Sequence, residues 1–127
     1  MTAILLEPDK GTKAYVYLSD IVDFYDKEVT ILLKTEKCFG VTDSTETVQI
    51  VSDAFCLNKD NLGMQLNVFP TPLFGTVVIT GWDNVQKKSC SLPSDFTLSS
   101  FSVQFFDSEQ TKQKKVELLK AYRGGSN

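Results

Sequence analysis

The side chains best suited to chemistry in this chain are carboxylates, because its 127 residues include no histidine. Histidine is the commonest general base and the usual activator of a serine or cysteine nucleophile. Four acids stand close together in "DIVDFYDKE": Asp20, Asp23, Asp26 and Glu28. Their spacing lacks the order and the turning glycine of a calcium-binding loop. The sequence therefore predicts no enzyme activity and no metal or cofactor site, and it places these acids at a solvated strand end.

The cysteines give no sign of a metal site or a disulfide framework. Cys38, Cys56 and Cys90 are far apart in the chain, form no C-x-x-C pair and have no histidine with which to share a zinc ion. We expect three reduced thiols packed inside an intracellular protein. The chain also has no run of about 18 apolar residues, which a membrane-spanning helix needs, and its start lacks the pattern of a signal peptide.

A second kind of chemistry is the stacking of nucleobases on aromatic rings. Tyr15, Tyr17 and Trp82 are candidate platforms, and Lys87 and Lys88 follow Trp82 closely. Single strands are held in this way when a basic groove runs beside the rings. The alternative is that the rings pack on neighbouring strands. For Trp82 we favour packing at the rim of the fold, with its indole N–H bonded to a polar neighbour.

The charge distribution favours a protein partner over a nucleic acid. Residues 1–106 carry eight lysines and thirteen acids, whereas residues 107–127 carry five basic and three acidic side chains. A strand-binding protein gains affinity by neutralising phosphates, which an acidic body repels. Arg123 is the single arginine, although guanidinium groups contact phosphates and bases better than lysine does. Direct nucleic-acid contact is therefore expected to be weak or assisted by another protein.

Short alternating runs must position these side chains. Five β-strands are expected, in "KAYVYLSDIVDFY", "KEVTILLK", "ETVQIVSD", "GTVVITGWDNVQ" and "DFTLSSFSVQFF". In the first run Tyr15 and Tyr17 share one side, and the phase slips near Ser19 as it does at a β-bulge. Gly81 interrupts the fourth run, which favours a bulge or a sharp coil of the strand.

The segment between residues 53 and 73 has two interpretations. "DAFCLNKDNLGM" could form a short helix, whereas "MQLNVF" alternates like a strand. Pro70 and Pro72 then impose an extended connector. The segment therefore contributes either a helix between the third and fourth strands or an additional strand.

These elements predict an all-β fold with one C-terminal helix, in a single domain over residues 1–127. The favoured architecture is a five-stranded barrel of the OB type. A bulged first strand supports it, because such a strand can pair with two neighbours around a closed wall. The alternative is an antiparallel β-sandwich in which "MQLNVF" supplies a sixth strand.

The stretch "DSEQTKQKKVELLKAYRGG" predicts the helix, over residues 107–123. It starts with the capping-box pair Asp107 and Gln110 and ends in basic residues before Gly124. Its last two turns carry one apolar side, made by Val116, Leu118, Leu119 and Tyr122. This side either plugs the open end of its own barrel or packs against another chain.

In layout, the chain resembles a known family of small OB-fold subunits. The first three strands correspond to "AYVYLSDIVDFY", "EVTILLK" and "TVQIVSD", the last two to "LFGTVVITGW" and "FSVQFF", and the helix to "KKVELLKAY". A single barrel of this length with a terminal helix resembles the Ten-one family, the smallest subunit of the telomeric CST complex. That family is itself similar to the smallest subunit of replication protein A.

The resemblance implies an accessory subunit that pairs with a larger, Stn-like OB-fold subunit and helps to cap chromosome ends in the nucleus. Pairing in that family uses helix-to-helix and barrel-to-barrel contact. Carried onto this sequence, the partner-facing residues would be Val116, Leu118, Leu119 and Tyr122. Any contact with single-stranded telomeric DNA would fall near Tyr15, Tyr17, Trp82, Lys87 and Lys88.

Two other functions fit the same pattern. One is a stand-alone module that binds single-stranded nucleic acid. The other is an all-β interaction domain, such as an adaptor or a capsid-like protein, outside nucleic-acid biology.

Overall fold

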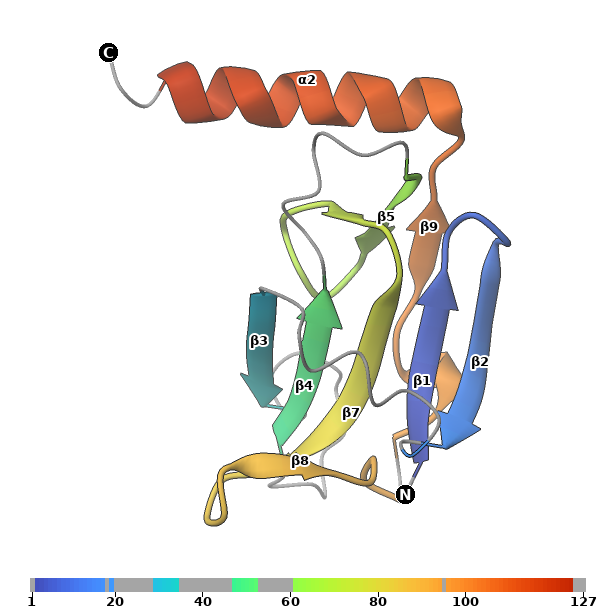
Figure 1. The fold of residues 1–127 in the computed structure, drawn as a ribbon, viewed down its shortest axis with the longest axis vertical. Coiled ribbons are helices and arrows are strands. Elements are labelled where there is room, and N and C mark those ends of the chain that lie inside the picture. The colour runs from blue at the N-terminus through green and yellow to red at the C-terminus, as the bar shows by residue number, and fades with distance from the viewer. Residues whose placement is uncertain are drawn as a thin grey trace.

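The fold is a computed structural model that describes residues 2–17, 19, 29–34, 47–52, 61–94 and 96–124, with the backbone alone at 29–34 and 122–124. Most of these residues belong to antiparallel strands, and one long helix follows them (Figure 1). The predicted helix in "DAFCLNKDNLGM" and the predicted phase slip near Ser19 lie almost wholly outside the described residues.

The larger sheet has six strands, in the order β2-β1-β7-β4-β3, with β8 paired to β7. Their bounds are β1 Thr2–Glu7, β2 Thr12–Tyr17, β3 Val29–Lys34, β4 Thr47–Ser52, β7 Val77–Asp83 and β8 Lys88–Cys90. The smaller sheet has the order β6-β5-β9, made of β5 Gly63–Leu66, β6 Leu73–Phe74 and β9 Val103–Phe105. All of the described pairings are antiparallel.

Strand β1 was not predicted, and the expectation that the first strand begins near Lys13 is wrong. β1 pairs with β2 along its whole length and with β7 from Ile4 to Leu6. β1 thus pairs with two neighbours, whereas the described part of the predicted first run, β2, pairs with β1. The β1–β2 connection is a tight turn, and Gly11 has φ 63° there, a conformation that glycine adopts without steric cost.

The main core lies between the two sheets. Ile4, Ile79 and Ile50 are aligned across β1, β7 and β4 and are fully buried. Side chains from the smaller sheet and from residues 92–101 complete this cluster, among them Met64, Leu66, Leu73, Leu92, Phe96 and Phe101. The opposite face of the larger sheet carries a smaller apolar cluster centred on Ala3 and Val78. Side chains that alternate along β1 and β7 thus serve two different faces.

The predicted all-β class with one C-terminal helix is confirmed. The pairing of the described strands produces two sheets and closes no barrel among them. β5 includes the first three residues of the run "MQLNVF", where the sandwich alternative requires a strand. The last predicted strand is shorter than expected, because "DFTLSSFSVQFF" contains a 3₁₀ turn, η2 (Leu98–Ser100), before β9.

The close approach of two strands explains Gly81. A Cβ atom at this position would overlap the backbone carbonyl oxygen of Ser91, which follows β8. Gly81 itself pairs with Val48 on one side and with Cys90 on the other. The glycine is therefore required for close packing of the chain against β7.

The helix α2 (Ser108–Gly124) confirms the predicted helix to within one residue at each end. The backbone N–H of Gln110 donates to Asp107 Oδ1 at 2.7 Å, and the N–H of Asp107 donates to Gln110 Oε1 at 3.1 Å. This is the predicted capping box. Figure 1 shows α2 lying across one end of the strands, far from the β7–β8 hairpin.

Candidate functional site

Helix α2 is fastened to the body through its first half. Thr111 is its only buried residue among the described side chains, and Thr111 Oγ1 accepts a hydrogen bond from the Gly63 N–H at 3.1 Å. One turn later, Lys115 Nζ donates to Asn61 Oδ1 at 3.0 Å and lies 5.5 Å from the centre of the Phe74 ring. These contacts are polar, so the helix is not held by a continuous apolar seam.

The apolar side of α2 divides between the body and the solvent. Val116 and Leu119 are exposed, with 45% and 43% of their surface accessible. Leu118, which is one helical turn from Lys115, is half-buried. The side chain of Tyr122 lies outside the described residues. Of the predicted partner-facing set, Val116 and Leu119 are thus available to another molecule.

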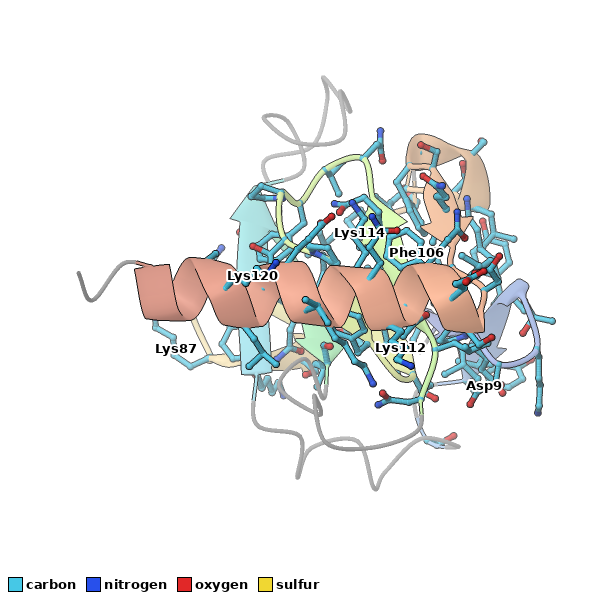
Figure 2. The ribbon with its side chains drawn as sticks, turned by 90° about the horizontal axis from the view of Figure 1, so that it is seen from above. Asp9, Lys87, Phe106, Lys112, Lys114 and Lys120 are labelled. Atoms are coloured by element: carbon cyan, nitrogen blue, oxygen red, sulfur yellow. The ribbon has the colours of Figure 1, made fainter. Side chains whose placement is uncertain are left out.

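Lysine side chains lie on both sides of α2. Figure 2 looks down on α2 and shows Lys112 on one side of the helix and Lys114 on the other. Lys114 Nζ is 3.6 Å from Glu117 Oε2 in an exposed ion pair, and such pairs contribute little to stability. The exposed side of the helix is therefore apolar at Val116 and Leu119, with the exposed Lys112 one turn before Val116.

The two tyrosines of β2 lie on the core-facing side of the larger sheet, at its edge. Tyr15 pairs with Ile4 and Tyr17 with Thr2, so their side chains leave the same face as Ile4. Tyr15 is 48% and Tyr17 68% exposed. The hydroxyl of Tyr15 accepts a hydrogen bond from the Leu98 N–H at 3.0 Å, which fixes this ring against η2.

A cation lies next to these rings on β2. Lys13 Nζ donates to the carbonyl oxygen of Phe101 at 2.8 Å and lies 4.1 Å from the centre of the Phe101 ring. Burial lowers the pKa of Lys13. Because the ammonium group of Lys13 already contacts the carbonyl oxygen and the ring of Phe101, it adds little to a phosphate-binding surface.

Trp82 lies on the opposite face of the larger sheet from the tyrosines. Trp82 pairs with Thr47 and Ser89. It lies three residues after Ile79 on β7, so its side chain leaves the face opposite to Ile79 and the main core. The ring is half-buried. Because of this register, Tyr15, Tyr17 and Trp82 do not form one continuous stacking platform.

The two candidate lysines lie at the tip of the β7–β8 hairpin. Lys87 has φ 56° in the turn and Lys88 pairs with Asp83, and both lysines are exposed. The N–H groups of Gln86 and Val85 donate to Asp83 Oδ1 at 3.1 and 2.9 Å. These backbone hydrogen bonds hold the pKa of Asp83 below its usual value, with a smaller contribution from the charge of Lys88. Val85 itself is 90% exposed.

A hollow beside α2 was not predicted. It has a volume of about 280 Å³ and is lined by Gln65, Gln104, Phe106, Gln110, Gln113 and Lys114. These residues come from β5, from β9 and the residue after it, and from the first turns of α2. No local pattern in the sequence marks them, because only the pairing of β5 with β9 and the direction of the helix bring them together.

The acids Asp20, Asp23, Asp26 and Glu28 and the thiols Cys38 and Cys56 lie outside the described residues, whereas Cys90 is half-buried at the end of β8. Within the described ranges, no three histidine, cysteine or acidic side chains gather as metal ligands. The described part of the chain also has no helix with the length and apolar character needed to cross a membrane. No protein-family model matches this chain, and neither a curated protein nor a solved structure shows significant similarity to it.

Proposed function

We propose that this chain is an interaction subunit that binds a protein partner through the outer side of α2. The observation that carries the proposal is the exposure of Val116 and Leu119 on a helix whose other side is already fastened to the body. Apolar side chains on a capped, anchored helix lose little conformational freedom on binding. A helix of this kind suits the helix-in-groove or helix-to-helix mode of recognition.

The size of the exposed pair sets a limit on its contribution. Burying the remaining surface of two half-exposed aliphatic side chains is worth roughly 1 kcal/mol each. A stable interface buries about 1,600 Å² in total, far more than Val116 and Leu119 provide. The partner must therefore also contact neighbouring parts of the helix, where Tyr122 belongs to the same predicted side, and part of the β body.

The more specific form of the proposal follows from the family resemblance. The body would be an OB-fold domain, and the partner a larger, Stn-like OB-fold subunit in a complex that caps telomeres in the nucleus. The all-β body and the single C-terminal helix support this form, because helix-to-helix pairing needs an accessible terminal helix. Single-stranded DNA would be held mainly by the complex.

A stand-alone nucleic-acid-binding module is the second candidate, supported by the 68% exposure of Tyr17. The separation of Tyr17 and Trp82 on opposite faces, the commitment of Lys13 and the net charge of −3 all count against it. The isolated chain should bind a telomeric oligonucleotide only weakly at physiological salt. Fluorescence anisotropy that showed sub-micromolar affinity with a steep loss at higher salt would favour the module instead.

The experiment for the pairing proposal compares two acidic substitutions. Val116→Glu with Leu119→Glu places charge on the proposed interface, and Val85→Glu places the same kind of charge on an exposed valine of the distant hairpin. The tagged chain is purified from native extract, and its partner is identified by mass spectrometry. Loss of an OB-fold partner with the double variant but not with Val85→Glu supports the proposal, provided that circular dichroism shows both variants folded.

A further inference from the structure

The hollow beside α2 has the composition of a binding site and lies apart from the exposed pair Val116 and Leu119. Gln65 and Gln104 pair across β5 and β9, so both side chains leave the face of the smaller sheet opposite to Met64 and the core. Figure 2 shows Phe106 and Lys114 on the same side of α2. The hollow is lined by carboxamides, one ammonium group and one buried aromatic ring, and by no carboxylate.

Two of the carboxamides are held in fixed orientations by the protein. Gln65 Nε2 donates to the carbonyl oxygens of Leu66 and Phe69 at 3.0 and 2.6 Å, which leaves Gln65 Oε1 as an acceptor. Gln110 Oε1 accepts the Asp107 N–H of the capping box, which leaves Gln110 Nε2 as a donor. The hollow thus presents one oriented acceptor and one oriented donor.

We propose that this hollow binds an adenine or cytosine nucleotide through the exocyclic amino group of its base, with the phosphate at Lys114. Such a base has an amino donor directly beside a ring-nitrogen acceptor, and carboxamides recognise this pair of groups. Gln65 Oε1 accepts from the amino group and Gln110 Nε2 donates to the ring nitrogen. Phe106 forms the apolar floor, and Gln104 and Gln113 bond to the remaining polar atoms.

The size and charge of the hollow agree with this ligand. A volume of about 280 Å³ is close to the lower limit of small-molecule sites, which suits one nucleotide and excludes a peptide of several residues. Lys114 is partly exposed, and among the described residues its ion-pair partner is Glu117, at 3.6 Å. A phosphate can replace this pair at little cost, since exposed ion pairs contribute about 0–1 kcal/mol.

A free nucleotide and a nucleotide within a single strand share this chemistry. The proposal does not depend on the protein partner, because the hollow and the exposed pair Val116 and Leu119 occupy different sides of α2. Measurements of nucleotide binding therefore test the hollow separately from the test of partner binding.

The experiment measures binding of the full chain to adenosine monophosphate and uridine monophosphate by calorimetry, and to short oligodeoxyadenylate and oligothymidylate by anisotropy at low salt. The adenine ligand of at least one pair should bind more tightly than its uracil or thymine counterpart. Binding of the monophosphate assigns the site to free nucleotides, and binding of the oligonucleotide alone assigns it to a strand.

Variants then connect binding to the hollow. Gln110→Glu keeps the acceptor for the Asp107 N–H but removes the donor, and it should weaken binding about tenfold. Lys114→Gln should weaken binding and lower the salt slope by about one, whereas Lys112→Gln, on the other side of the helix, should leave both unchanged. Thermal melting verifies that each variant is folded. Equal binding of the adenine ligands and their uracil or thymine counterparts, no binding at all, or equal effects of Lys114→Gln and Lys112→Gln would overturn the proposal.

Discussion

Strand β7 and helix α2 are held in the same small protein by different forces. Five of the seven residues of β7 are buried, between β1, β4 and β8. Among the described side chains of α2, Thr111 alone is buried, and the helix is attached by hydrogen bonds and one cation over a ring. The sheet therefore supplies most of the stability, and the helix retains apolar surface for recognition.

The largest loss of stability should come from truncating a side chain at the centre of the core, which separates the contribution of β7 from that of α2. Ile79→Ala removes a fully buried side chain that contacts both sheets, and the cavity should lower the free energy of unfolding by about 2–5 kcal/mol. Leu119→Ala removes a similar volume from α2 and should change it by less than about 0.5 kcal/mol. Urea denaturation measures both. Equal losses would mean that α2 belongs to the same apolar core.

The next largest loss of stability should come from a substitution at Gly81, where β7 packs closely against the residue that follows β8. Gly81→Ala forces a methyl group against the carbonyl oxygen of Ser91 and should cost about 1–3 kcal/mol, because backbone must move. Gly11→Ala is the control, since nothing lies within 4 Å of the added atom and only the positive φ opposes it, at about 1–2 kcal/mol. Cross-strand contacts between β7 and β8 in NMR spectra should be lost only in Gly81→Ala.

The attachment of α2 should respond to loss of a single hydroxyl group. Thr111→Val keeps the shape but leaves the buried Gly63 N–H without its acceptor, which should cost about 1–3 kcal/mol. Amide hydrogen exchange should show faster exchange in the first turns of α2, with little change in β4 and β7. Thr111→Ser retains the hydroxyl group and should preserve the protection of the helix. If Thr111→Val exchanges like the wild type, the hydrogen bond does not anchor α2.

The smallest expected effect is a pH-dependent stabilisation of the β7–β8 hairpin through Asp83. The N–H groups of Gln86 and Val85 lower the pKa of Asp83, so their stabilisation is present above the unfolded pKa of about 3.9 and is lost as pH falls through the folded value. An NMR titration of the Asp83 carboxyl should show a midpoint below that of an unfolded peptide. Lys88→Gln should raise this midpoint only slightly, because the backbone hydrogen bonds are the larger cause. A return to the peptide value in Lys88→Gln would assign the shift to charge instead.

Local patterns predicted the elements that local interactions determine. The capping box Asp107–Gln110 and the length of α2 follow from neighbouring residues, and the β-branched residues in "TVQIVS" and "VVITGW" favoured strands at β4 and β7. β1 was missed because both of its faces carry apolar residues, so "TAILLE" does not alternate. Such doubly covered strands lack the period-two signal.

The candidate site required information that no local pattern contains. That Tyr15 and Trp82 lie on opposite faces depends on the register of β1 with both β2 and β7. The division of the apolar side of α2, with Leu118 toward the body and Leu119 outward, depends on how Thr111 and Lys115 fasten the helix. The faces of Tyr15 and Trp82 and the orientation of α2 are both determined by long-range contacts. Spacings of three or four residues in the sequence do not contain this information.

The surface that we propose for binding another protein is the outer side of α2. The most direct test of this proposal is the affinity of the identified partner, measured by calorimetry, for the wild type, for Val116→Glu with Leu119→Glu, and for Val85→Glu. The double variant should lose at least about tenfold in affinity, while Val85→Glu should bind like the wild type and all three proteins should melt at similar temperatures. Unchanged affinity of a folded double variant would contradict the proposal.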